Sequence, residues 1–354
     1  MLRYNHFSFP FRCAFSTSRG YNGHEFRPSK IPRGGRPSGS GDEPAVLLRP
    51  AREPHRLIRR HTAWRAGVAA AETAFLSFLV SALPVSSGDV TDVRVAPAEA
   101  VQGDTVAVIV HAAPGTVVVV RLDGAPVPTF AAGGALRRAL IATDPDTRTG
   151  RYTIAVTITR PGEPPVRIVR IAHVRAGAFR ARRLTLPPKT FGLITPKNLA
   201  IERDALRPVL LRQTPVAWWQ GPFQAPSTGE MDSPYGEQGI YNGHREWWHQ
   251  GVDFSAPAGS PVTAGNAGVV TLARTLPLGG NTIVIDHGQG VVTEYLHLSA
   301  FTVAVGDRVE KGTVIGRIGA TGLVTGPSLH WGLYVLGVPV NPLFWLAPHA
   351  GLTS

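Results

Sequence analysis

Three residues in the last third of the chain are of the types that hold a catalytic metal ion: His249, Asp253 and His330. Two imidazoles and one carboxylate suit a zinc site in which three protein ligands leave the fourth position open to water or substrate. Two further candidates are His297, in Tyr-Leu-His, and Ser328, in Ser-Leu-His. Because a lone histidine in a β-rich domain more often makes a structural hydrogen bond, the prediction depends on the combination.

The local sequence indicates which of these side chains share a face. Residues 249–259 contain two glycines and a proline without helical periodicity, so they should be extended or looped. Positions separated by an even number share a face in an extended chain, which puts His249 and Asp253 on one side. Residues 328–335 alternate as a strand, with Ser328 and His330 on one face and Trp331 on the other.

The elements that must position these residues are short β-strands separated by glycine turns. The β-branched runs predict strands over residues 261–262, 267–272, 282–285, 291–295, 308–309, 314–318 and 329–336. Strands and helices do not alternate here, so the pattern predicts an antiparallel all-β domain.

Residues 223–345 resemble the lysostaphin-type, LytM-like zinc metallopeptidases, which cut peptide cross-links in bacterial cell walls. The similar stretches occur in the family's order: residues 233–236, 249–259, 281–288, 295–299, 305–312 and 321–331. The resemblance implies that residues 223–354 form the family's antiparallel β barrel-sandwich hybrid domain. It also implies that Zn²⁺ is the cofactor.

Carried over position by position, the resemblance makes His249, Asp253 and His330 the zinc ligands. It makes His297 a catalytic histidine that orients the attacking water or stabilises the tetrahedral oxyanion. The family's second catalytic histidine is replaced by Ser328.

A serine hydroxyl can donate a hydrogen bond but cannot change charge near neutral pH, as imidazole can. Loss of a general acid or base costs on the order of a hundredfold to ten-thousandfold in rate. The ligand set therefore predicts zinc binding in either case, whereas turnover depends on what replaces this imidazole. His244 and His287 are candidate substitutes, although His287 also fits a structural role at a strand end.

The loop before the ligands, residues 237–248, is rich in aromatic residues. We expect Tyr241, Asn242, Trp248 and Trp331 to contact the substrate. An aromatic groove that grips an extended peptide or a glycan would be lined by Tyr241, Trp247, Trp248, Trp331 and Tyr334. The alternative is that some of the aromatic side chains pack in the core.

Upstream, residues 89–174 hold five β-rich runs at a spacing typical of a small immunoglobulin-like β-sandwich. This unit contains no catalytic constellation, so we expect it to act as a spacer, to bind the wall or to shield the active-site cleft. Residues 175–222 are interpreted as a connector, with a helix predicted at 198–206. The fold class is therefore mainly β.

The net charge of +12 is concentrated near the N-terminus, because residues 1–65 hold 13 Lys and Arg against 4 Asp and Glu. Residues 1–57 are rich in Arg, Gly, Ser and Pro and are predicted to be a disordered basic tail. The remainder is nearly neutral, so nucleic acid is not an expected partner of the folded part.

Residues 58–88 resemble a secretion signal, with a basic flank, an apolar run at 66–83 interrupted by Glu72, and small residues beyond it. Its position suits a signal if translation begins downstream of Met1, and we expect a misassigned start. The alternatives are an internal membrane anchor or a buried helix. The single cysteine, Cys13, cannot form an internal disulfide, which is compatible with export without requiring it.

The resemblance implies a secreted zinc metalloendopeptidase that hydrolyses peptide cross-links or stems of bacterial peptidoglycan. It would act in the periplasm, in the cell envelope or outside the cell. The main alternative is a weak or inactive regulator that binds the cell wall, for example an amidase activator, and keeps the metal site. A third hypothesis is an envelope-binding module with an incidental metal site.

Overall fold

The computed structural model describes residues 92–349, 351 and 352. The predicted basic tail (1–57) and signal-like segment (58–88) lie outside these residues. The described part is mainly β, as predicted. None of its helices is both long and apolar enough to cross a membrane, and the apolar run at 66–83 lies outside the described residues.

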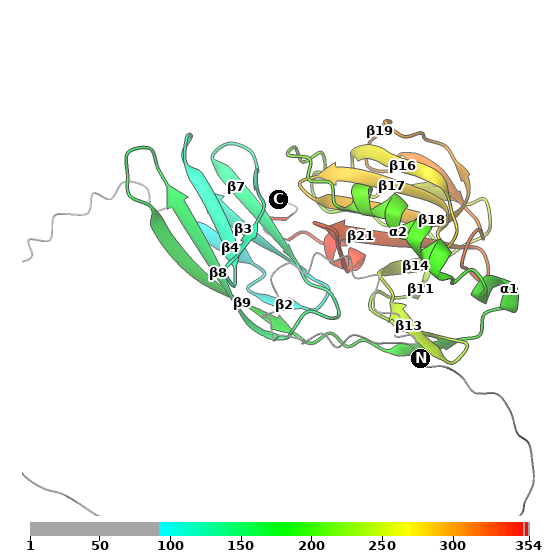
Figure 1. The fold of residues 1–354 in the computed structure, drawn as a ribbon. Coiled ribbons are helices and arrows are strands. Elements are labelled where there is room, and N and C mark those ends of the chain that lie inside the picture. The colour runs from blue at the N-terminus through cyan, green and yellow to red at the C-terminus, as the bar shows by residue number, and fades with distance from the viewer. Residues whose placement is uncertain (1–91, 350, 353–354) are drawn as a thin grey trace, which may run out of the picture. The chain divides into compact units, whose positions relative to one another are not determined.

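Residues 93–175 form a sandwich of two sheets (Figure 1). The first sheet has the order β1-β3-β7-β6, formed by Val93–Ala96, Thr105–His111, Leu136–Ala142 and Thr129–Ala131. The second has the order β2-β9-β8-β4-β5, formed by Glu99–Val101, Val166–Arg175, Gly150–Thr159, Val117–Leu122 and Ala125–Val127. Their inner faces bury β-branched residues such as Val108, Ile154 and Val156, as alternating strands must.

The connector contains strand β10 (Ala181–Leu184) and helices α1 (Pro188–Phe191) and α2 (Pro196–Leu210). Helix α2 contains the predicted helix and is longer, because Thr195 caps its N-terminus and Pro196 fits its first turn. The Thr195 hydroxyl accepts a hydrogen bond from the backbone N–H of Asn198 at 3.1 Å. The buried side of α2 packs Leu206 and Leu210 against the main sheet of the C-terminal domain.

The C-terminal domain is built on one large sheet with the central order β11-β14-β21-β18-β17-β16-β19. These strands are Glu230–Ser233, Gly251–Ser255, Ser328–Val335, Val291–Phe301, Gly280–Gly288, Gly268–Leu276 and Arg308–Val309. Strands β15 (Pro261–Thr263), β20 (Val314–Ile318) and β22 (Val338–Val340) pair at its margins, and the 3₁₀ helix η1 (Pro342–Leu346) follows. All pairs in this sheet are antiparallel, as predicted.

A smaller sheet lies before the first candidate ligand. It joins β10 to the hairpin of β12 (Gln238–Tyr241) and β13 (His244–Trp248). The β10–β12 pair is parallel, which the sequence pattern did not predict. The connector therefore reaches the loop that leads into His249.

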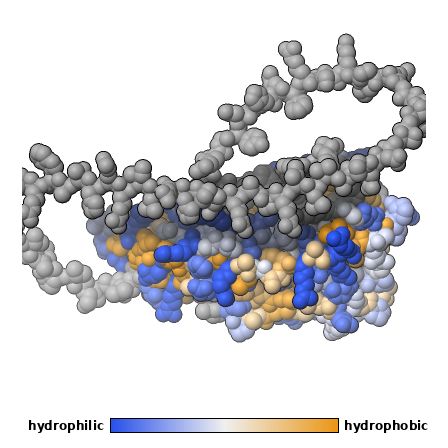
Figure 2. Space-filling view, turned by 90° about the horizontal axis from the view of Figure 1, so that it is seen from below, coloured by the Kyte–Doolittle hydropathy of each residue, from blue (hydrophilic) through white to orange (hydrophobic). Residues whose placement is uncertain are grey.

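The C-terminal core continues into the first sheet of the sandwich, since Ala107 and Leu140 belong to the same buried cluster as the C-terminal apolar residues. Arg138 on β7 is buried there, and its Nε donates to Oε1 of Gln289 at 3.1 Å. Its guanidinium also lies 4.4 Å from the ring centroid of Trp219, a cation–π contact. On the face in Figure 2, the coloured residues form no single apolar surface, because polar residues interrupt the apolar ones.

Candidate metal centre

The three predicted ligands come from two neighbouring strands and the turn before one of them. Asp253 on β14 and His330 on β21 are directly paired across the ladder. His249 lies in the short link between β13 and β14. Two backbone hydrogen bonds hold this link: His249 N–H donates to the Glu237 carbonyl at 2.7 Å, and Gly236 N–H donates to the His249 carbonyl at 2.8 Å.

The ligand atoms of these residues converge on one point. His249 Nε2 lies 3.0 Å from Asp253 Oδ1 and 3.0 Å from His330 Nδ1, and His330 Nδ1 lies 2.9 Å from Asp253 Oδ1. Donors bound to one tetrahedral zinc ion at about 2.0–2.1 Å lie about 3.3 Å apart. The three side chains are therefore close enough to bind one metal ion. Among the described residues, they form the cluster of His, Cys, Asp or Glu side chains that could hold such an ion.

The far side of the His249 ring shows which nitrogen is available to a metal. Its Nδ1 lies 2.9 Å from the Pro234 carbonyl, which can only accept, so Nδ1 carries the proton and donates. This leaves the Nε2 lone pair directed at the cluster, the usual arrangement for a metal-binding histidine.

The cluster is partly open to solvent. The side chains of His249 and Asp253 are 17% and 28% exposed, whereas that of His330 is 10% exposed. Solvent therefore reaches the cluster mainly at Asp253 and least at His330.

Contacts within the cluster favour the ionised form of Asp253 and the protonated form of His330. Burial opposes ionisation of Asp253, but the charge and hydrogen bonds of His249 and His330 lower the pKa of this carboxyl well below its usual range. Burial also opposes protonation of His330, but hydrogen bonds to Asp253 and Glu294 raise its pKa to about 9. A cation placed among these groups would meet an ionised carboxylate.

His297 stands beside this cluster on β18, with its ring centroid 6.5 Å from that of His330. Its Nδ1 lies 2.9 Å from the Thr321 carbonyl, and its backbone N–H donates to the Gly279 carbonyl at 2.8 Å. Its φ of +68° is rare for a residue with a side chain, so the surrounding contacts impose this conformation. Burial, followed by the nearby His330, lowers the pKa of His297 to about 4.

Ser328, which replaces the family's histidine, begins β21 opposite Ser255. Its hydroxyl donates to the Phe254 carbonyl at 3.4 Å. Of the two candidate substitutes, His287 is unsuitable, since it is fully buried and both ring nitrogens lie 2.7 Å from partners, the Ala267 carbonyl and Thr293 Oγ1. The structural interpretation of His287 is therefore correct, and the side chain of His244 lies outside the described atoms.

The predicted aromatic groove is wrong in part. Trp331 is completely buried and lies on the face of β21 opposite to His330, so it packs in the core and does not line a groove. Tyr334 is also buried, with its hydroxyl donating to Glu294, and the side chain of Trp247 lies outside the described atoms. Asn242 joins β12 to the connector, since its side-chain amide makes two hydrogen bonds with the backbone of Leu186. Trp248 donates from Nε1 to Asp146 Oδ1 at 3.0 Å, and Tyr241 is half-buried on β12.

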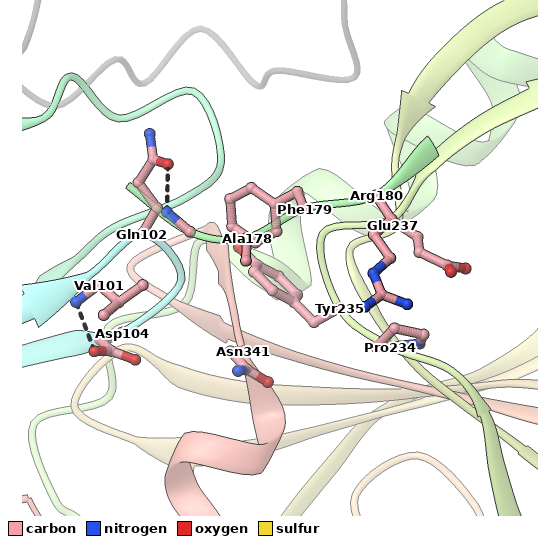
Figure 3. Close-up of a pocket in the computed structure, with 11 residues that line it drawn as sticks. Val101, Gln102, Asp104, Ala178, Phe179, Arg180, Pro234, Tyr235, Glu237 and Asn341 are labelled. Atoms are coloured by element: carbon pink, nitrogen blue, oxygen red, sulfur yellow. Dashed lines mark hydrogen bonds between the residues drawn. The ribbon is translucent and has the colours of Figure 1, made fainter. Parts of the chain in front are cut away.

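A cavity of about 410 Å³ lies beside the loop that precedes His249 (Figure 3). Phe179 and Tyr235 lie next to each other at its centre, with ring centroids 6.3 Å apart, and Glu237 and Arg180 lie at one end. None of its lining residues belongs to the three-residue cluster, but two of them, Pro234 and Glu237, accept hydrogen bonds from His249. The cavity therefore borders the residues that hold this candidate ligand.

Glu294 is a residue near the cluster that sequence reasoning missed. Its carboxylate on β18 is almost fully buried and lies 3.7 Å from Nε2 of His330. The signal was present, because an acidic residue inside a predicted buried strand, directly before Tyr-Leu-His, is unusual without a partner.

Comparison with known proteins agrees with this geometry. Residues 248–342 match peptidase family M23. The chain is 48% identical over 95 residues to peptidoglycan DD-endopeptidase ShyA of Vibrio cholerae, covering 27% of this chain and 22% of that protein. It is 42% identical over 124 residues to DD-carboxypeptidase/endopeptidase Mpg of Neisseria meningitidis, covering 35% of this chain and 29% of that protein. The chain thus spans about a quarter of the length of these relatives.

A solved structure described as a putative peptidase M23 from Pseudomonas aeruginosa is similar to a larger part of the chain. It has a TM-score of 0.52 and 25% identity, and it covers 70% of this chain and 95% of its own. Through its C-terminal domain, the chain belongs to peptidase family M23 and is LytM-like.

Proposed function

We propose that this chain is a zinc metalloendopeptidase that hydrolyses peptide cross-links or stems of bacterial peptidoglycan. The observation that carries the proposal is the convergence of His249, Asp253 and His330 on one partly exposed point. The substrate class follows from ShyA, which is named a peptidoglycan DD-endopeptidase, and the reaction class also from Mpg, which is named a DD-carboxypeptidase/endopeptidase.

In this proposal, His249 Nε2, Asp253 Oδ1 and His330 Nδ1 would hold the ion. When bound, zinc supplies Lewis acidity for a peptide carbonyl and acidifies water. The carboxylate of Asp253 offsets part of the positive charge, and the hydrogen bond from His249 to Pro234 keeps that ring oriented. The open side at Asp253 would admit an extended peptide.

His297 is proposed to handle the proton of the attacking water. The Thr321 carbonyl accepts from Nδ1–H of His297, which leaves Nε2 as an acceptor with a free lone pair. The lowered pKa keeps this ring neutral at pH 7. A neutral imidazole with Nε2 free can accept a hydrogen bond from water, take its proton and then stabilise the oxyanion as a donor.

The alternative of a wall-binding regulator with little turnover is favoured by one observation, the serine at position 328. This residue donates to a backbone carbonyl and cannot accept a proton near neutral pH. Activity would then depend on His297 as the one described catalytic imidazole.

The test is zinc stoichiometry measured together with muropeptide release from purified sacculi. One zinc ion per chain with soluble products is the expected result. Zinc without release would support the regulator, and absence of zinc would refute the metal site. Because the relatives act on peptidoglycan, we also propose that the protein acts outside the cytoplasm, in the periplasm, the envelope or the medium.

A further inference from the structure

The face of the sheet that carries the candidate ligands has an unusual gap beside His330. Gly251 on β14 and Gly332 on β21 are paired directly, and Gly332 is paired on its other side with Glu294 on β18. The next row along the same face contains Asp253 and His330. Two neighbouring strands therefore lack a side chain at the position adjacent to the candidate metal ligands.

This gap is filled by the imidazole of His330 and the carboxylate of Glu294. A Cβ atom on Gly251 would lie 2.7 Å from Nε2 of His330, and one on Gly332 would lie 2.9 Å from Oε1 of Glu294. Real Cβ atoms do not approach other heavy atoms this closely, so neither position can hold a side chain while His330 and Glu294 keep these places. At Gly251 the Trp331 carbonyl oxygen, 2.4 Å from such a Cβ, excludes a side chain as well. The space at the paired glycines thus allows His330, one of the candidate ligands, to lie next to the buried carboxylate of Glu294.

Further contacts orient both the His330 imidazole and the Glu294 carboxylate. His330 presents Nδ1 to Asp253 and His249, and Nε2 to Glu294, with Nε2 and Oε1 3.7 Å apart. On its other side, Oε1 of Glu294 accepts a hydrogen bond from the Tyr334 hydroxyl at 2.6 Å. Glu294 and Tyr334 are both buried, and the second carboxylate oxygen, Oε2, has no hydrogen-bond partner.

A buried carboxylate with an unpaired oxygen is costly to maintain without a function. The Tyr334 hydroxyl satisfies only part of its hydrogen-bonding capacity. Among the described residues, its ion-pair partner is the imidazole of His330, 3.7 Å away. This arrangement matches the carboxylate–histidine–metal triads in which an acidic residue fixes the tautomer and orientation of a metal-binding histidine.

We infer that Glu294 is a positioning residue for metal binding: with Tyr334 behind it and the Gly251–Gly332 gap in front, its carboxylate faces Nε2 of His330 at 3.7 Å, favours the tautomer protonated at that nitrogen and directs Nδ1 at the metal. This inference rests on the proposed zinc site. It assigns to β18 a role in metal affinity besides carrying His297, and it explains why this buried strand contains a carboxylate.

The role predicts a loss of metal affinity when the carboxylate is removed. Partners of this kind typically contribute about 10–100-fold to metal affinity. We expect Glu294→Ala to weaken zinc binding within this range in a competition titration with a chromophoric chelator at fixed pH. Glu294→Gln should lose less, because the amide oxygen can still face Nε2–H. Gly332→Ala should weaken binding by displacing an intact Glu294.

A matched control is Glu202→Gln. Glu202 is also a buried carboxylate, but it binds the backbone N–H groups of Leu278 and Gly279 and contacts none of the three ligands. It should therefore leave the zinc dissociation constant unchanged, even where it lowers thermal stability. Circular dichroism would show that each variant is folded, and Glu294→Gln, which keeps the side-chain shape, remains informative if Glu294→Ala does not fold.

The outcomes separate this inference from the proposed function. If the unaltered chain binds zinc and the folded Glu294 and Gly332 variants bind it equally tightly, the positioning role is refuted while the zinc site stands. If the unaltered chain binds no zinc, both are refuted. A drop in affinity in the Glu294 and Gly332 variants, but not in Glu202→Gln, would establish the role.

Discussion

Replacing Ser328 by histidine tests whether the missing imidazole limits the rate. Strand β21 rises by about 3.3 Å per residue, so position 328 lies about 7 Å from position 330 on the same face. An imidazole there would face the same open side of the cluster as Asp253. The Ser328 hydroxyl makes one long hydrogen bond, 3.4 Å to the Phe254 carbonyl. Loss of this hydrogen bond should cost no more than about 1 kcal/mol of stability.

The expected gain is large by comparison. A positioned general acid or base contributes about a hundredfold to ten-thousandfold, or about 2.7–5.5 kcal/mol of transition-state stabilisation. We therefore expect Ser328→His to release muropeptides from sacculi at least about tenfold faster, at equal zinc content, even where its geometry is imperfect. Liquid chromatography of the soluble products would measure the initial rates.

The control is Ser328→Ala, which removes the hydroxyl without adding an imidazole. Its rate should equal that of the unaltered chain, because the hydroxyl is engaged with a backbone carbonyl. If Ser328→His is folded, holds zinc and is no faster, the missing imidazole does not limit turnover. If Ser328→Ala loses most of its activity, the serine itself takes part in the reaction and the reasoning is wrong.

Three further predictions follow from the described contacts. Asp253→Ala should reduce bound zinc from about one ion per chain to a small fraction, since only two imidazole ligands remain. Metal analysis after dialysis would measure this, and zinc retained at one ion per chain would contradict the ligand assignment. Burial lowers the pKa of His287 from 6.5 to about 4, so the unfolded chain binds this proton first as the pH falls. His287 should therefore contribute a loss of about 3 kcal/mol to the free energy of unfolding between pH 6.5 and pH 4. Urea titrations of the unaltered chain and of His287→Gln should differ in this pH slope, and equal slopes would exclude His287 as the cause. Glu202→Gln should destabilise the fold by about 2 kcal/mol, because Glu202 binds the backbone N–H of Gly279. It should also lower kcat at unchanged zinc content, because the Gly279 carbonyl accepts from the backbone N–H of His297. An unchanged kcat would show that this link between Glu202 and His297 is not needed.

The candidate ligands were accessible from sequence because their placement depends on local geometry. Even spacing in extended segments puts His249 with Asp253 and Ser328 with His330, and the structure brings the two pairs together through one ladder. The main strands and helix α2 were predictable for the same reason, since β-branched alternation and a proline-bearing helix start are local signals. Strand β7 was missed because two arginines interrupt its apolar run, and one of them, Arg138, is buried by partners distant in sequence.

The aromatic groove shows the limit of periodicity. Alternation places Trp331 and His330 on opposite faces of one strand, but it does not say which face is covered. The large sheet buries the Trp331 face completely and leaves the His330 face next to the open cluster.

The sequence by itself determined the chemistry of the site: two imidazoles and one carboxylate at spacings that extended strands turn to a common side, with a serine where the family has another histidine. Only the tertiary structure decided which buried groups support that site. The Glu294 carboxylate on β18 lies 3.7 Å from Nε2 of His330 on β21, beside a gap made by Gly251 on β14 and Gly332 on β21, and these three strands are far apart in sequence. Such contacts depend on the register of strands and on the space left by missing side chains, and neither is encoded in any local stretch of the chain.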